Sequence, residues 1–189
     1  MKTKFIIILA AICSLAGTAS AATDPVTPGS SPAAAAKPAQ RPKPQVTKFD
    51  DWSMQCLSST KGKYCGLYQK ANGTVDGKSI PAVVAEVEIS KSKDGKKLPH
   101  LRLITPLGVW LPTNIGFKLD EEKQNVVPFF ICGRTGCMTE LTLEQQHVDK
   151  LKKGKKLVIG YKLNPKKQVE STLSLKGFAA ALEALQKNG

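Results

Sequence analysis

The sequence predicts a mainly β protein, an antiparallel β-sandwich with one short helix and a C-terminal helix. About eight short segments alternate apolar and polar residues, which is the period of strands that bury one face. Glycine, proline and asparagine residues that favour turns lie between these segments. Many short strands separated by turns are typical of a sandwich.

The first predicted strand starts at Trp52, which alternates with polar neighbours up to Cys56. Asn72-Gly73 then favours a turn before the next apolar segment. Further alternating segments lie at residues 82–89, 101–105, 115–119, 157–161 and 169–175.

Residues 126–143, VVPFFICGRTGCMTELTL, predict a hairpin, because two β-compatible runs are joined by a short loop that contains glycine. Cys132 and Cys137 lie where the two strands leave that loop. Directly opposed residues of an antiparallel pair have Cα atoms about 4.5–5.5 Å apart, a distance that a disulfide tolerates. We therefore predict that a disulfide closes this hairpin.

Two segments have helical spacing instead. Residues 143–153 place Val148 and Leu151 on one side, and Gly154 favours a helix end there. The last segment has apolar residues at positions i, i+3, i+4 and i+7, namely Phe178, Ala181, Leu182 and Leu185. We expect this stripe to pack on the sandwich, with a partner-binding amphipathic helix as the alternative.

The amino-terminal residues are predicted to lie outside the folded domain. Residues 1–21 have a basic start, an apolar run too short to span a bilayer, and a small-residue cleavage site that ends at Ala21. They predict a signal peptide. Residues 22–47 are rich in proline and alanine, which predicts a disordered spacer. Residues 48–189 form the predicted β-sandwich domain, with no transmembrane segment left after cleavage.

Four cysteines remain after Cys13 is removed with the signal peptide. Four cysteines in an exported chain imply two disulfides, and the sequence allows three pairings. We favour two local bonds, each of which would contribute about 2–3 kcal/mol. A zinc site is the competing interpretation, and the wide cysteine spacing fits it poorly. The favoured pairs are Cys56–Cys65 and Cys132–Cys137.

No catalytic constellation is apparent. His100 and His147 are the only two histidines, and neither lies beside a serine or cysteine motif. The cysteines are expected to be oxidised, so that no thiolate nucleophile remains. The sequence also has no glycine-rich phosphate loop and no cluster of metal ligands. We therefore expect a protein that is not an enzyme and that has no cofactor and no metal.

Charge is the conspicuous property of the chain. The net charge is +13, and loss of Lys2 and Lys4 with the signal peptide lowers it to +11. Clustered lysines can simply be solvated, or they can attract an anionic surface, where each basic residue near anionic lipid contributes about 1 kcal/mol. Anionic lipid or polysaccharide fits an exported protein, whereas nucleic acid does not. The residues of this hypothesis are Lys91, Lys93, Lys96, Lys97, Lys150, Lys152, Lys153, Lys155 and Lys156.

The order of several motifs resembles a known family. The motifs are D-W-x-M-x-C from residue 51, Y-C-G-L from 64, P-L-G-V-W-L-P from 106, F-F-I-C-G-R-T-G-C from 129 and S-L-K-G-F-A-A-A-L from 174. They are similar to those of the invasion-associated locus B family of exported alphaproteobacterial proteins, whose named members come from Bartonella. The resemblance covers about residues 49–185.

This resemblance implies an immunoglobulin-like β-sandwich in the periplasm or outer membrane that is linked to invasion of host erythrocytes. We therefore expect a non-catalytic envelope protein that contributes to virulence by invasion or adhesion, with host-cell surface or envelope components as partners. The alternative is a periplasmic envelope-maintenance or accessory factor, or an envelope enzyme. No active site transfers from the family, and the framework residues besides the four cysteines are Trp52, Gly108, Gly133, Gly177 and Phe178.

Overall fold

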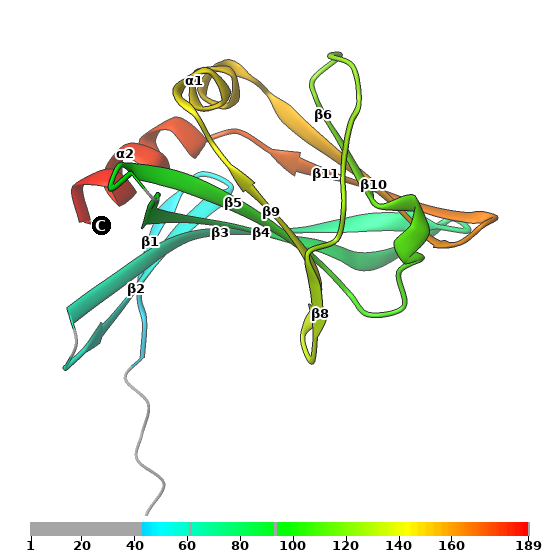
Figure 1. The fold of residues 1–189 in the computed structure, drawn as a ribbon, viewed down its shortest axis with the longest axis horizontal. Helices are drawn as coiled ribbons and strands as arrows, with labels where there is room; N and C mark the ends of the chain where they lie inside the picture. The colour runs from blue at the N-terminus through cyan, green and yellow to red at the C-terminus, as the bar shows by residue number, and fades with distance from the viewer. Residues whose placement is uncertain (1–42, 61, 93, 189) are drawn as a thin grey trace, which may run out of the picture. The chain divides into compact units, whose positions relative to one another are not determined.

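A computed structural model describes residues 43–60, 62–92 and 94–188 (Figure 1). The predicted signal peptide and residues 22–42 of the predicted spacer lie outside these residues. In the described part, eleven strands form one continuous antiparallel sheet, and two α-helices and one 3-10 helix complete the fold.

The strands are β1 (Gln45–Phe49), β2 (Trp52–Ser59), β3 (Gly62–Val75), β4 (Lys78–Lys91), β5 (Lys97–Thr105), β6 (Ile115–Leu119), β7 (Asn125–Val127), β8 (Ile131–Gly133), β9 (Gly136–Thr142), β10 (Lys156–Asn164) and β11 (Lys167–Ser174). The helices are η1 (Leu111–Thr113), α1 (Gln145–Lys153) and α2 (Phe178–Asn188).

The sheet folds over on itself at β3. This long strand pairs with β2 through residues 62–68, and further along it pairs with β11 at Gly73 and Thr74. A register shift between Ala71 and Asn72 interrupts its pairing with β4, and a bulge of this kind bends a strand and increases its twist. Beyond the bend, β11, β10 and β6 form a layer opposite β3, β4 and β5 (Figure 1). The mainly β sandwich architecture predicted from the sequence is therefore confirmed, with its two layers joined in one sheet.

Gly73 lies where the two layers meet. A Cβ atom at this position would be 2.7 Å from the carbonyl oxygen of Glu170 and 2.8 Å from side-chain atoms of Ala82 and Val169. These separations are shorter than van der Waals contact, so the close approach requires glycine. Nearby, the buried Tyr161 hydroxyl of β10 donates to the carbonyl oxygen of Ala82 on β4 at 3.0 Å, which joins the two layers directly.

Trp52 anchors the other end of the core. Its ring is 2% exposed and packs edge-on against Phe178, with ring centroids 5.1 Å apart. The indole Nε1 donates to the carbonyl oxygen of Ser174 at 2.9 Å, and the buried Gln69 side chain donates to the same oxygen at 3.0 Å. The start of α2 is therefore fixed to β2 and β3 by packing and by hydrogen bonds.

Both predicted helices are present. α1 buries Val148 and Leu151, and Gly154 follows its last residue. α2 buries all four residues of the predicted stripe, Phe178, Ala181, Leu182 and Leu185. The stripe therefore packs into the core rather than remaining free for a partner.

Two boundaries differ from the prediction. Strand β1 begins at Gln45, so the last three residues of the predicted spacer, 45–47, belong to the sheet. The alternation of apolar and polar residues does not reveal β1, because its side chains are almost all exposed. Backbone pairing with β2 holds this strand in the sheet. The predicted hairpin of residues 126–143 is also shorter than expected. Val126 and Val127 pair with β6, and Pro128, which cannot donate a ladder hydrogen bond, separates them from β8.

We predict that Gly73→Ala lowers the free energy of unfolding by about 1–3 kcal/mol or more, because the new methyl group forces the layers apart. Gly160→Ala in β10 is the matched control, since its Cβ would meet only ordinary contacts at 3.7 and 3.9 Å. We expect that control to change stability by less than about 1 kcal/mol. Urea unfolding of the oxidised protein measures both. Equal losses of stability in the two variants would show that the close approach of the layers at Gly73 does not require glycine.

Candidate functional site

The structure places the predicted lysines on two separate elements. Lys91, Lys96 and Lys97 lie exposed at the turn between β4 and β5, and Lys93 lies outside the described residues. The other group follows the last turn of α1 into the start of β10. Its members are Lys150, Lys152, Lys153, Lys155 and Lys156.

Carboxylates accompany much of the second group. Lys150 pairs with Glu122 at 3.0 Å, Lys152 with Glu183 at 3.3 Å, and the third pair joins Lys156 and Glu121 at 3.2 Å. Within the described part of the chain, Lys153 and Lys155 are exposed and form no ion pair, as is also true of Lys91 and Lys96. The lysine clusters are visible in the sequence, but the acidic residues that lie beside them in the folded protein are not.

Both disulfides have local pairing. Cys56 and Cys65 are directly opposed in β2 and β3, with Cα atoms 4.1 Å apart. Cys132 and Cys137 are opposed in β8 and β9, with Cα atoms 4.0 Å apart. The described residues contain no group of three or more histidine, cysteine or acidic side chains that could hold a metal ion.

A polar network that the sequence prediction missed covers the outer face of β3, β4, β5 and β9. Tyr68, Glu86, Arg102 and Glu140 are directly opposed across these four strands. The Arg102 guanidinium contacts Glu88 at 2.9 Å, Glu140 at 3.3 Å and Glu86 at 3.7 Å. The alternation of Glu86 and Glu88 with apolar residues was the available signal, since it puts both on one face.

Partial burial changes the ionisation of this network. It raises the pKa of Glu86, with the Tyr68 hydrogen bond and Arg102 acting in the opposite direction. Burial also raises the pKa of Tyr64 and Tyr68, and hydrogen bonds to Glu88 and Glu86 raise them further. His100 Nδ1 lies 3.0 Å from Glu140 in the same network. The arrangement links four strands, and its carboxylates are already engaged by Arg102, His100 and the tyrosines.

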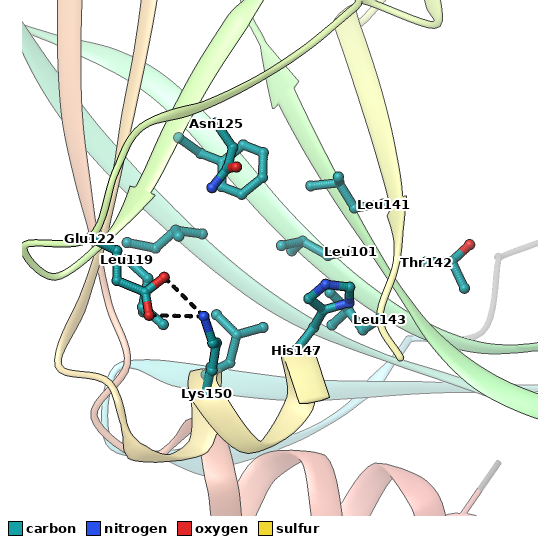
Figure 2. Close-up of a pocket in the computed structure, with 12 residues that line it drawn as sticks. Leu101, Leu119, Glu122, Asn125, Leu141, Thr142, Leu143, His147 and Lys150 are labelled. Carbon is teal, nitrogen blue, oxygen red and sulfur yellow. Dashed lines mark hydrogen bonds and ion pairs between the residues drawn. The ribbon is translucent and has the colours of Figure 1, made fainter. Parts of the chain in front are cut away.

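A cavity of about 240 Å³ lies between the two layers, beside α1 (Figure 2). Its walls are mainly leucine side chains from β5, β6, β9 and β10, together with Phe117. Polar groups from α1 and the β6–β7 connection lie at its rim: His147 and the ion pair of Lys150 with Glu122 (Figure 2). The leucine-lined part of this cavity can hold an apolar group. The two histidines are used differently, since His147 lines this cavity and His100 belongs to the outer-face network.

These features define a disulfide-bonded, antiparallel β-sheet protein with a basic surface. A family model described as invasion associated locus B (IalB) protein matches residues 52–186, which is most of the chain. The chain therefore belongs to the invasion-associated locus B family. Proteins of this family are generally exported by bacteria. No helix in the described residues is both long and apolar enough to cross a membrane.

Curated relatives and a solved structure agree with this assignment. Invasion protein B homologues of Brucella abortus strain 2308 and biovar 1 strain 9-941 are each 28% identical over 139 residues, which cover 73% of this chain and 77% of theirs. The crystal structure of invasion associated protein B from Bartonella henselae superposes with a TM-score of 0.60 at 21% identity. That match covers 76% of this chain and 95% of the other, and it supports the fold.

We predict that native tyrosines ionise above their ordinary pKa of about 10. All three tyrosines of the chain are affected, and burial raises the pKa of Tyr161 to about 12. A raised pKa favours the neutral phenol in the folded state. The associated stability is therefore present below about pH 10 and is lost as the pH rises through the folded values. Near-ultraviolet titration should show clearly less tyrosinate in the folded protein at about pH 10 than in the unfolded chain. Equal amounts of tyrosinate in the two states would contradict the burial of the tyrosine side chains.

Proposed function

We propose that the protein is a non-catalytic, exported envelope protein that contributes to virulence through contacts with host cells during invasion or adhesion. The observation that supports this most strongly is the family match, because it covers residues 52–186 and therefore most of the folded domain. The Brucella and Bartonella proteins are also named for invasion rather than for a reaction. Erythrocytes are the host cells that the family resemblance suggests.

Electrostatic attraction is the proposed first contact. The chain has a net charge of +13, and the exposed lysines that lack an ion pair among the described residues can approach an anionic surface without first losing a partner. Anionic lipid headgroups and anionic polysaccharides both offer the required charge. Surface charges act over about 10 Å at 0.1 M salt and over about 3 Å at 1 M salt. Contact of this kind should therefore weaken steeply as salt increases.

A deletion strain tests the role directly. Invasion of erythrocytes and envelope integrity, measured as detergent sensitivity, should be compared in the deletion strain and in the strain complemented with the full chain. Reduced invasion with a normal envelope supports the proposal. General detergent sensitivity with no specific loss of invasion would contradict it and would favour an envelope-maintenance or accessory role.

We predict that replacing the lysines at the end of α1 weakens binding to erythrocytes or anionic vesicles at least tenfold at 0.1 M salt, since each contributes about 1 kcal/mol near an anionic surface. The substitutions are Lys152→Gln, Lys153→Gln, Lys155→Gln and Lys156→Gln. The fold should remain stable, because the ion pairs removed lie at the surface and contribute about 0–1 kcal/mol each. Sedimentation with cells or vesicles measures the binding.

The matched control removes four positive charges from other exposed elements, with Lys63→Gln, Lys70→Gln, Lys78→Gln and Lys176→Gln. We expect a smaller loss from this control, since these side chains lie outside the two predicted lysine groups. Equal losses would mean that net charge alone determines binding. No loss from either variant, or binding that is insensitive to salt, would leave the lysine groups without a binding role.

A further inference from the structure

Two connections between the layers leave the sheet at neighbouring positions. The first, residues 106–114, joins β5 to β6, and the second, residues 128–130, joins β7 to β8. At one end, Ile115 pairs with Val127, so both connections meet the β6–β7 pair. At the other end, Thr105 pairs with Cys137, which is bonded to Cys132. The two connections together with the adjoining strands β7 and β8 are called here the apolar crossover.

The apolar crossover exposes large hydrophobic side chains. Phe130 is 75% exposed and Trp110 is 40% exposed. The other four exposed members, Leu107, Leu111, Val126 and Ile131, are 49–57% exposed. Single exposed hydrophobic residues are common on protein surfaces and need no explanation. Here six of the nine exposed large hydrophobic residues in the described part of the chain belong to one region, so scatter does not explain them.

The backbone holds these side chains in their exposed positions. The amide of Trp110 donates to the carbonyl oxygen of Lys162 at 2.6 Å, and the amide of Phe130 donates to the carbonyl oxygen of Met138 at 2.7 Å. The buried Thr139 hydroxyl donates to the carbonyl oxygen of Pro128 at 2.8 Å, and the Cys132–Cys137 disulfide closes β8 onto β9. A surface that is already ordered loses little conformational entropy when it binds. In Figure 1, the β8–β9 hairpin projects from the sheet.

The charge of the apolar crossover selects its partner. Residues 106–114 and 125–133 contain no charged residue. Arg134 follows directly, and Lys162 of β10 accepts the hydrogen bond from the Trp110 amide. The acidic residues 120–122 lie at the far end of the β6–β7 pair, where Glu121 pairs with Lys118. Tryptophan and phenylalanine beside basic residues are typical of surfaces that enter the interface of a bilayer, where apolar burial and attraction to anionic lipids add together. A second copy of this chain would bring the same cations together and is less favourable.

We propose that the apolar crossover docks the protein on an anionic lipid bilayer, with Trp110, Phe130 and Ile131 entering the interface. This mode of binding extends beyond the lysine groups and does not depend on a host-cell receptor. Arg134 and Lys162 beside the apolar crossover add attraction to anionic headgroups, and the apolar side chains provide the short-range contact that salt does not screen.

The test uses the mature full chain with vesicles of phosphatidylcholine alone or mixed with phosphatidylglycerol. Trp110 is a natural probe, because the only other tryptophan, Trp52, is 2% exposed in the core. We expect Trp110 emission to shift to shorter wavelength with the anionic vesicles, and more weakly with the neutral ones. No shift on either vesicle overturns the proposal, whether or not a strain lacking the protein loses invasion.

A pair of double variants separates the apolar crossover from other exposed hydrophobic residues. Phe130→Ser with Ile131→Ser should weaken vesicle partition about tenfold or more. Val46→Ser with Leu57→Ser removes similarly exposed residues from β1 and β2 and should change it by less than about twofold. Equal losses overturn the proposal. Sedimentation velocity should show that the unsubstituted protein does not self-associate through this surface. If the protein does self-associate and the Phe130/Ile131 variant abolishes that association, a second copy is the occupant and the proposal fails.

Discussion

The bend in β3 is the constraint on which the rest of the structure depends. One strand pairs first with β2 and then with β11, and this change of partner turns a single sheet into two facing layers. Gly73 permits the turn because a side chain there would collide with Glu170 and Val169. The interlayer cavity and both connections of the apolar crossover exist because the two layers face each other. At the opposite end, Trp52, Gln69 and Ser174 fix α2 against the core.

The two disulfides act in different environments. Cys56 and Cys65 are buried in the core between β2 and β3, so their bond reinforces contacts that packing already favours. Cys137 is also buried, whereas Cys132 is exposed on the short strand β8, which pairs only with β9 in the described sheet. A three-residue edge strand buries little apolar surface of its own, so its covalent link matters more there. The second disulfide thereby maintains the shape of the apolar crossover.

Local patterns in the sequence were sufficient for much of the fold. Alternation located most strands, the spacing of Phe178 and Leu182 located α2, and opposed cysteines located the β8–β9 turn. Features that depend on pairing between distant segments were not predictable in this way. β1 lacks a buried face, and the partners of Lys150 and Lys152 come from a loop and from α2. Phe130 lies in an apolar run that predicts one strand of a hairpin, yet it is exposed in the connection after Pro128, where the pairing with β6 has ended.

Charge and apolar exposure occur on different elements, so their contributions to binding can be separated. The proposed long-range attraction involves lysines at the β4–β5 turn and the end of α1, and the proposed contact involves the exposed apolar residues of the apolar crossover. The central claim is that the apolar crossover is the contact surface. Hydrogen–deuterium exchange of the mature chain with and without anionic vesicles tests it most directly. Slower exchange in residues 106–114 and 126–133 is the expected result, and protection confined to α1 and residues 150–156 would contradict it.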